Sequence, residues 1–195
     1  MNLALLLVVC YLIGAIPTGV ILTRLAGVGD VRQSGSGNIG ATNVYRVAGR
    51  KLGILTLVGD ALKGLLPVLW IAHSPLFTPW QVALAAAVTF LGHLYPVYLG
   101  FKGGKGVATA LGIFLVLSPL AVLVALLLFI AILWKWRYVS LASISAAAAI
   151  PFLAGGIERS LPLFAASLFI GGMVIVRHRA NITRLRAGTE SRFKA

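Results

Sequence analysis

Long apolar runs alternate with short polar, glycine-rich or basic stretches along almost the whole chain. An apolar helix needs about 20 residues to cross the hydrocarbon core of a membrane, and fewer when its neighbours cover its ends. Seven runs meet this condition. They cover residues 3–23 with a break at Pro17, 52–72, 80–99, 107–117, 119–134, 140–153 and 161–176. The pattern predicts a bundle of about seven transmembrane helices.

The composition gives the chain no means of forming a soluble surface. Of its 195 residues, 59% are hydrophobic and 11% are charged, whereas a soluble domain has about 25% charged residues. We therefore expect an all-α integral membrane protein with a single membrane-embedded domain over residues 1–195. No basic segment precedes the first run, which argues against a cleaved signal peptide. The single cysteine, Cys10, excludes a disulfide framework.

The basic residues gather on one side of the predicted membrane. Of the 17 Lys and Arg residues, Arg159 falls on the other side and Lys63 lies within a span. The rest are Arg24, Arg32, Arg46, Arg50, Lys51, Lys102, Lys105, Lys135, Arg137, Arg177, Arg179, Arg184, Arg186, Arg192 and Lys194. Because cytoplasmic loops carry the excess of Lys and Arg, we expect the N-terminus outside and the C-terminus inside the bacterial cytoplasmic (inner) membrane. The same rule explains most of the net charge of +13 without nucleic acid.

A segment rich in glycine, serine and asparagine follows the first span, on the basic side. It covers residues 34–43, with Arg46 just after it, and it contains a G-x-G-x-x-G pattern. A dinucleotide site would need a preceding strand, but a membrane helix precedes this segment. Its neutral donors are Ser36, Asn38, Thr42 and Asn43. Glycines let backbone N–H groups converge on an anion, so an anion site and a flexible re-entrant turn both fit the pattern.

A second glycine-rich segment, Lys102-Gly103-Gly104-Lys105-Gly106, follows the third span. It is not a Walker A motif, because Leu99 and Gly106 stand where that motif has glycine and Ser/Thr. Two lysines flanking a Gly-Gly pair at a helix start are typical of a phosphate cradle. A loop that only sets topology needs the lysines but not the glycines, so the pattern favours phosphate binding.

Further polar residues are candidates for a site. His178 and Asn181 would share a face if the last helix continues beyond its span, and His178 can be a base, a phosphate ligand or an interface residue. Asp60 and Lys63 lie within the second span, either as a functional pair or as a mutually neutralising structural pair. Ser143 can face a polar site or bond to the backbone.

Acidic residues are scarce, which limits the chemistry. The four are Asp30, Asp60, Glu158 and Glu190. No His, Asp and Glu residues have the spacing of metal ligands. The His-x4-Asp signature of many acyltransferases is missing after each of the three histidines, and so is the DxxDG signature of membrane alcohol-phosphotransferases. An enzyme of this composition would act by positioning and charge stabilisation.

Taken together, these segments resemble the bacterial acyl-phosphate:glycerol-3-phosphate acyltransferases of the PlsY type. The resemblance is carried by residues 34–46, by 92–96 with 101–109, by 140–143, and by the pattern R-H-x-x-N-I-x-R-L-x-x-G-x-E over 177–190. Separate motifs in the same order are more specific than any one of them, and the resemblance covers the whole chain.

The resemblance implies a reaction. A fatty acyl group passes from acyl phosphate to the 1-hydroxyl of glycerol 3-phosphate, giving lysophosphatidic acid and inorganic phosphate as the first step of phospholipid biosynthesis. The implied partners are these two substrates and membrane lipids, without nucleic acid, acyl-CoA, acyl carrier protein, metal or other cofactor. The arrangement is compatible with a monomer. A small anion or lipid-phosphate transporter and a purely structural membrane subunit are the alternatives.

The resemblance also implies roles for individual residues. The expected catalytic set is Ser36, Arg46, Lys105, His178 and Asn181. The expected substrate-binding set is Gly37, Asn38, Gly40, Thr42, Asn43, Lys102, Gly103, Gly104, Ser143 and Glu190, of which Glu190 ties the tail to the site. A substrate phosphate is implied to help deprotonate the attacking hydroxyl, and a base role for His178 is the alternative.

Overall fold

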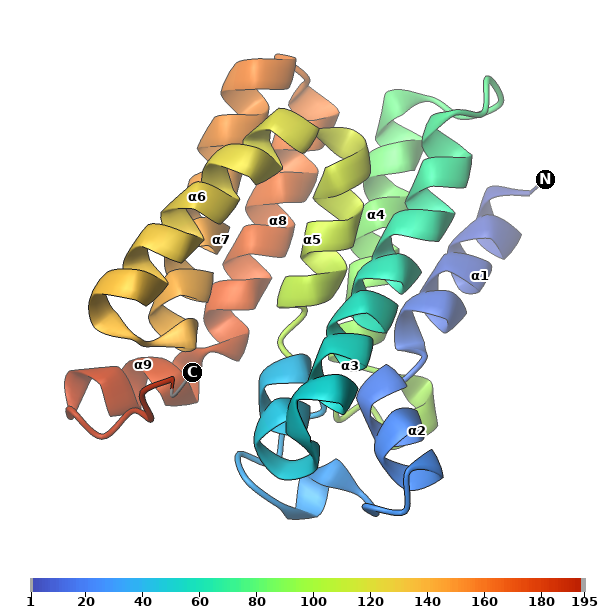
Figure 1. The fold of residues 1–195 in the computed structure, drawn as a ribbon. Coiled ribbons are helices and arrows are strands. Elements are labelled where there is room, and N and C mark those ends of the chain that lie inside the picture. The colour runs from blue at the N-terminus through green and yellow to red at the C-terminus, as the bar shows by residue number, and fades with distance from the viewer. Residues whose placement is uncertain (1, 194–195) are drawn as a thin grey trace. The chain divides into compact units, whose positions relative to one another are not determined.

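The computed structural model describes residues 2–193, which form helices joined by short loops (Figure 1). The α-helices are α1 (Leu3–Ala15), α2 (Thr18–Leu25), α3 (Ala41–Ala72), α4 (Pro79–Leu94), α5 (Val107–Leu117), α6 (Pro119–Trp136), α7 (Val139–Glu158), α8 (Leu161–Arg177) and α9 (Arg179–Arg186). Two 3-10 turns, η1 (Val31–Gln33) and η2 (Val97–Leu99), lie between them. Lys194, which the sequence places among the basic residues of the tail, lies outside the described residues.

The predicted all-helical membrane fold is confirmed, and the number of spans is approximate. Within the described residues, four helical segments are long and apolar enough to cross a membrane. The number rises to six if the bent pairs α1–α2 and α8–α9 each count as one span. The break at Pro17 bends the first pair by 43°, as the sequence predicts. Helix α5 has only 11 residues, so the predicted seven are reached only when this short helix is included.

The chain divides into two compact units, the first ending at Val116 and the second starting at Leu117. The single domain over residues 1–195 therefore stays a prediction. In the first unit, drawn from blue to yellow-green in Figure 1, α1 packs along α4, and α3 packs against α2 and α4. Glycines permit the closest approaches: a Cβ at Gly14 would overlap the backbone of Thr89 in α4.

In the second unit, α7 packs against both α6 and α8, and α9 contacts α7 and α8. A hydrogen bond joins the beginning of α6 to the end of α7, because Ser118 Oγ donates to Glu158 Oε1 at 2.7 Å. Glu158, one of the four acidic residues of the chain, therefore has a structural partner.

The outer surface of the helices is apolar. In α6, Leu123 is 53% exposed, Leu127 59% and Trp134 85%. A soluble protein rarely exposes such a surface over a large area. Lipid tails are as apolar as leucine, so a helix in a bilayer gains nothing by hiding these side chains. The surface is that of an integral membrane protein.

One predicted boundary is wrong. Helix α7 continues to Glu158 and does not end at residue 153, because membrane helices tolerate internal glycines such as Gly155 and Gly156. The third predicted span is confirmed over Pro79–Leu99, with the helix ending at Leu94 and the last residues forming the 3-10 turn η2 after Pro96. Helix α3 is in turn interrupted at Gly49, whose φ of 85° is in the left-handed region, so residues 41–48 form a separate short helix.

The last helix does not continue in a straight line. Helix α8 ends at Arg177, and α9 departs from it by 56°. The residue at the bend is His178, whose N–H bonds to the carbonyls of both Val174 and Ile175, a tightened turn that ends the regular helix. His178 and Asn181 lie at the first turn of α9, where the N–H of Ile182 bonds to the carbonyl of His178, and both side chains are buried.

Candidate functional site

The first glycine-rich segment is folded around the side chain of Asn43, which is 2% exposed. Its Oδ1 accepts a hydrogen bond from the backbone N–H of Ser36 at 2.8 Å. Its Nδ2 donates to three carbonyls, those of Val31 and Ser34 at 3.1 Å and Asn38 at 2.8 Å. The side chain thus holds the loop together. Its predicted contact with a substrate stays a prediction and would require one of these bonds to be exchanged.

Glycine is required where this loop turns around the asparagine. Gly35 has a φ of 62°, and a Cβ at this position would overlap Asn43 Oδ1. Any L-residue would therefore be strained in its backbone and would displace the side chain that holds the loop. The first glycine of the G-x-G pattern, Gly35, is therefore explained by the backbone conformation of the loop.

The loop ends at the N-terminus of α3. The backbone N–H of Gly40, the residue before the helix, donates to Asn38 Oδ1 at 2.9 Å. Thr42 follows in the first turn, partly buried. Ser36 in the loop and Arg46 on the short helix 41–48 are both exposed. Their exposure leaves both side chains accessible to an anion beside a helix N-terminus, where the dipole favours negative charge.

Two of the basic residues before this loop have a structural partner. Asp30 Oδ2 lies 2.6 Å from Arg32 Nη2 and 2.9 Å from Arg24 Nη2. The hydrogen bond from Arg32 outweighs the effect of burial and holds the pKa of Asp30 well below its usual range. Asp30 is therefore an ionised partner of arginines, and these two arginines are partly neutralised.

The second glycine-rich segment is fastened to the end of α4. The N–H of Gly103 donates to the carbonyl of Leu94, and that of Gly104 to the carbonyl of His93, both at 3.2 Å. A phosphate cradle would direct these two N–H groups at the anion, but here they bond to α4. A phosphate at this loop would rely on Lys102, Lys105 and the start of α5. Lys102 is exposed and Lys105 is partly buried.

In the second unit, Glu190 gathers several polar residues. Its Oε1 accepts from Ser140 Oγ at 2.7 Å and from Asn181 Nδ2 at 2.6 Å, and its Oε2 lies 2.6 Å from Arg184 Nε. Burial opposes ionisation, but these hydrogen bonds outweigh it, so the pKa of Glu190 lies below its usual range. The ionised carboxylate joins the tail to α7 and α9.

Two other predicted residues of this unit bond to the backbone. Ser143 Oγ donates to the carbonyl of Val139 at 2.8 Å, which is the structural alternative considered for it. His178 is 3% exposed, and its Nδ1 lies 2.8 Å from the carbonyl of Val174. A carbonyl can only accept, so Nδ1 carries the proton. In the neutral ring Nε2 then holds the lone pair.

Comparison with known proteins identifies the family. Residues 4–188 match the family model described as glycerol-3-phosphate acyltransferase. The chain belongs to the glycerol-3-phosphate acyltransferase family. A family member from Syntrophotalea carbinolica is 64% identical over 190 residues, covering 97% of each chain. One from Geobacter sulfurreducens is 57% identical over 195 residues, covering 100% of each.

Solved structures agree with this. The crystal structure of PlsY, an integral membrane glycerol 3-phosphate acyltransferase, in its glycerol 3-phosphate form matches with a TM-score of 0.94 and 41% identity. The match covers 98% of this chain and 96% of that one. The lysophosphatidic acid form of PlsY matches with a TM-score of 0.91 and 40% identity over 98% and 95% of the two chains.

One residue has no predicted role, although it lies within the segment 92–96 that carries the family resemblance. His93 is 3% exposed and contacts the second glycine-rich segment through its backbone and its ring. Its sequence signal is weak, because a histidine at the end of an apolar span is usually an interface residue. Its position ten residues before a Gly-Gly pair could have drawn attention to it.

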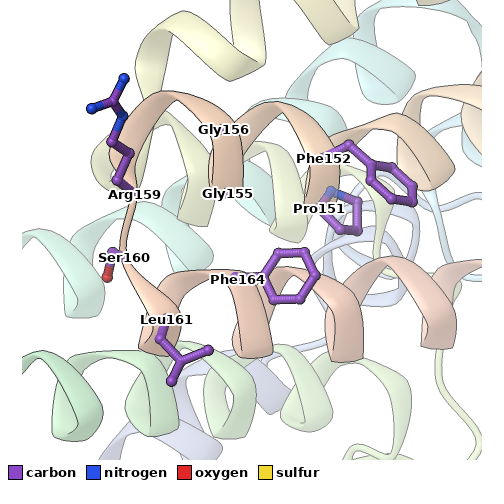
Figure 2. Close-up of a pocket in the computed structure, with 8 residues that line it drawn as sticks. All are labelled: Pro151, Phe152, Gly155, Gly156, Arg159, Ser160, Leu161 and Phe164. Atoms are coloured by element: carbon purple, nitrogen blue, oxygen red, sulfur yellow. The ribbon is translucent and has the colours of Figure 1, made fainter.

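A groove in the second unit contains none of the predicted site residues. It has a volume of about 440 Å³ and lies between the end of α7 and the start of α8 (Figure 2). Its lining is Pro151, Phe152, Gly155, Gly156, Arg159, Ser160, Leu161 and Phe164. Apart from Arg159 and Ser160 the lining is apolar, so the groove lacks the groups that acyl transfer needs. Arg159 is therefore a suitable control for substitutions of basic residues.

Proposed function

We propose that this protein transfers a fatty acyl group from an acyl phosphate to the 1-hydroxyl of glycerol 3-phosphate. The hydroxyl oxygen forms an ester bond with the acyl carbon, and the bond from that carbon to the phosphate oxygen breaks. The hydroxyl proton ends on the released inorganic phosphate, and the other product is lysophosphatidic acid. Family membership supports the acceptor and the acyl transfer. The acyl phosphate donor follows from the resemblance to the PlsY-type acyltransferases, and the chemistry of the chain is compatible with it.

The observation that supports an acyl phosphate donor is that every carboxylate in the sequence already has a partner. Asp30 is paired with arginines, Asp60 with Lys63, Glu158 with Ser118, and Glu190 with Arg184 and two hydrogen-bond donors. An unengaged carboxylate is what a strong general base would require. An acyl phosphate is a mixed anhydride with a good leaving group, and the phosphate of glycerol 3-phosphate can help to remove the hydroxyl proton. Such a donor needs positioning and charge stabilisation, which basic loops can supply.

In our proposal, six residues bind glycerol 3-phosphate: Ser36, Arg46, Lys105, Ser143, His178 and Asn181. The two glycine-rich segments receive the head of the acyl phosphate, and Glu190 orients Asn181. No metal is assigned a role.

Radiolabelled glycerol 3-phosphate and acyl phosphate, supplied to the purified protein in detergent, test the function directly. We expect a labelled acylated product and an equal amount of inorganic phosphate. Matched reactions with acyl-CoA or acyl carrier protein as donor should give none. Product formation from acyl-CoA alone would contradict the donor. Failure with every donor would favour a transporter or a structural subunit.

We propose that the N-terminus is outside the cytoplasmic membrane, with the glycine-rich loops and the tail inside. The prediction is that Lys102→Cys and Arg186→Cys react with a membrane-impermeant thiol reagent only after the membrane is opened. Leu76→Cys and Arg159→Cys should react from outside in intact cells. All four positions are exposed, so the labels can reach them. Cys10 is buried, and a Cys10→Ala background removes its contribution.

The reverse labelling pattern would overturn the orientation. It would move the basic loops to the outer face, away from cytoplasmic glycerol 3-phosphate. If position 102 were labelled from outside and position 186 only from inside, the second glycine-rich segment and the tail would lie on opposite sides of the membrane. That result would contradict the proposal that both lie on the cytoplasmic side.

We expect His178→Gln to raise KM for glycerol 3-phosphate and to keep appreciable kcat at saturation. The Nδ1–H of His178 bonds to the carbonyl of Val174, which holds the ring in one orientation, and in our proposal the ring contacts the substrate through Nε2. Glutamine retains a polar group of similar reach, so loss of binding should exceed loss of chemistry. Steady-state kinetics at saturating acyl phosphate measures both constants.

The acceptor glycerol separates binding from base catalysis. Because it lacks the phosphate that would help remove the proton, wild-type enzyme should acylate glycerol very poorly even at high concentration. If His178→Gln instead loses several orders of magnitude in kcat with KM unchanged, His178 is the base.

A further inference from the structure

A buried ion pair in the first unit has no role in the proposed reaction. Lys63 Nζ lies 2.8 Å from Asp60 Oδ1, and the two side chains are 5% and 3% exposed. Lys63 Nζ also donates to the carbonyl of Ile16 at 2.7 Å, where α1 ends and the last carbonyls need partners outside the helix. Charges at membrane depth are costly and usually have a function.

His93 connects this pair to the second glycine-rich segment. Its Nδ1 lies 3.8 Å from Asp60 Oδ1. Two other atoms of the ring, Nε2 and Cε1, lie so close to Gly104 that a Cβ there would overlap them. Gly104 also bonds through its N–H to the carbonyl of His93. The loop therefore rests on both the backbone and the ring of one histidine, whose ring is next to the buried pair.

The helix that follows the loop is held by the same stretch of α3. Gly64, the residue after Lys63, faces the backbone of Thr109 in α5 so closely that a Cβ would overlap it. Gly112 of α5 faces the backbone of Ala61, the residue after Asp60, in the same way. One turn of α3 thus carries the ion pair and also fixes the helix that begins just after Lys105.

We propose that Asp60, Lys63 and His93 form a positioning cluster that fixes the backbone at Gly103 and Gly104 and so sets how tightly this loop binds a substrate phosphate. That the loop binds a substrate phosphate rests on the proposed function. That the cluster fixes the loop rests only on the contacts described above. Because the cluster acts through the loop, its removal changes KM and leaves the chemical step almost unaltered.

The contact between Gly104 and His93 can be tested as a pair. The backbone of Gly104 is outside the left-handed region, and the three atoms nearest to a Cβ there all belong to the His93 ring. Gly104→Ala should therefore raise KM for acyl phosphate about tenfold, and adding His93→Ala should raise it little further, since both substitutions remove the same contact and contacting residues are coupled. If the two losses simply multiply in the double variant, the positioning contact is wrong.

Single variants separate positioning from chemistry. His93→Ala should raise KM for acyl phosphate about tenfold while kcat stays within about threefold of wild type. His73→Ala is the matched control, since His73 is exposed just after α3, and it should change neither constant. Asp60→Leu combined with Lys63→Met removes both charges without leaving one unpaired, and it should act like His93→Ala. A fall in kcat with unchanged KM would overturn the positioning role.

Hydrogen exchange gives a measurement that needs no substrate. The amides of Gly103 and Gly104 should exchange faster in His93→Ala than in wild type or His73→Ala, because the ring no longer supports the loop. Unchanged exchange would overturn the positioning cluster even in an active enzyme. Absence of acyl transfer by the wild type would overturn the proposed function and leave the exchange result standing.

Discussion

Lys105→Ala is expected to lower kcat/KM for acyl transfer about 30- to 1,000-fold, and Arg46→Ala by a similar factor. A charge-assisted contact in a water-poor site contributes on the order of 2–4 kcal/mol to transition-state stabilisation. Hydrogen bonds from the N–H groups of Gly103 and Gly104 fasten the second loop to α4. The alanine variant should therefore keep the loop and lose the charge, which steady-state kinetics in detergent would measure.

Arg159→Ala is the matched control for both substitutions. It removes the same kind of charge from the apolar groove between α7 and α8, and kcat/KM should stay at the wild-type value. A Lys105→Ala enzyme with nearly wild-type kcat/KM would remove this residue from phosphate binding. An equal loss in Arg159→Ala would show that the effect depends on total charge.

Glu190→Ala should destabilise the second unit and lower kcat/KM about a hundredfold, because Asn181 loses the partner that orients it. The substitution leaves Ser140, Asn181 and Arg184 without their common acceptor. Arg184 is 43% exposed, so the cost should be about 2–3 kcal/mol, less than for a fully buried pair. The corresponding loss in Tm is roughly 5–10 °C. Thermal unfolding and kinetics of the folded fraction measure the two effects separately.

The stabilisation by Glu190 should depend on pH in a defined direction. The folded pKa of this carboxyl is lowered, so its contribution is complete above the unfolded glutamate pKa of about 4.3. It is lost as the pH falls through the lower folded value. The difference in Tm between wild type and Glu190→Gln should therefore shrink as the pH is lowered below that range. A difference that does not change with pH would contradict the ionised contact.

The spans could be predicted from the sequence because a bilayer imposes a length and an apolar composition on any helix that crosses it. Their ends could not be predicted with the same accuracy. The sixth span is predicted to end at residue 153, but α7 continues through Gly155 and Gly156 to Glu158. The bend at His178 depends on hydrogen bonds to Val174 and Ile175 that leave no mark in the residue pattern.

The loops of the candidate site could be located because glycine, serine, asparagine and lysine are unusual beside apolar spans. The direction in which each polar group faces was beyond the sequence. Asn43 looks like a donor for a ligand, but its amide is used inside the loop. The glycines at 103 and 104 look like an anion cradle, but their N–H groups bond to α4. His93 and Asp60 are far apart in the chain, so only the packing of α3 against α4 shows that they are neighbours.

Because the outer surface of α6 is apolar, the two substrates reach this protein from different phases, and their concentrations are expressed in different units. A protein with this surface works inside the lipid phase, and an acyl phosphate with a fatty chain dissolves in that phase as well. Its availability is then a mole fraction of the membrane, whereas glycerol 3-phosphate is counted per volume of water. Doubling the lipid or detergent at a fixed amount of donor halves the donor's surface density and leaves the acceptor unchanged. The rate of acylation therefore follows the composition of the membrane as well as the amount of enzyme.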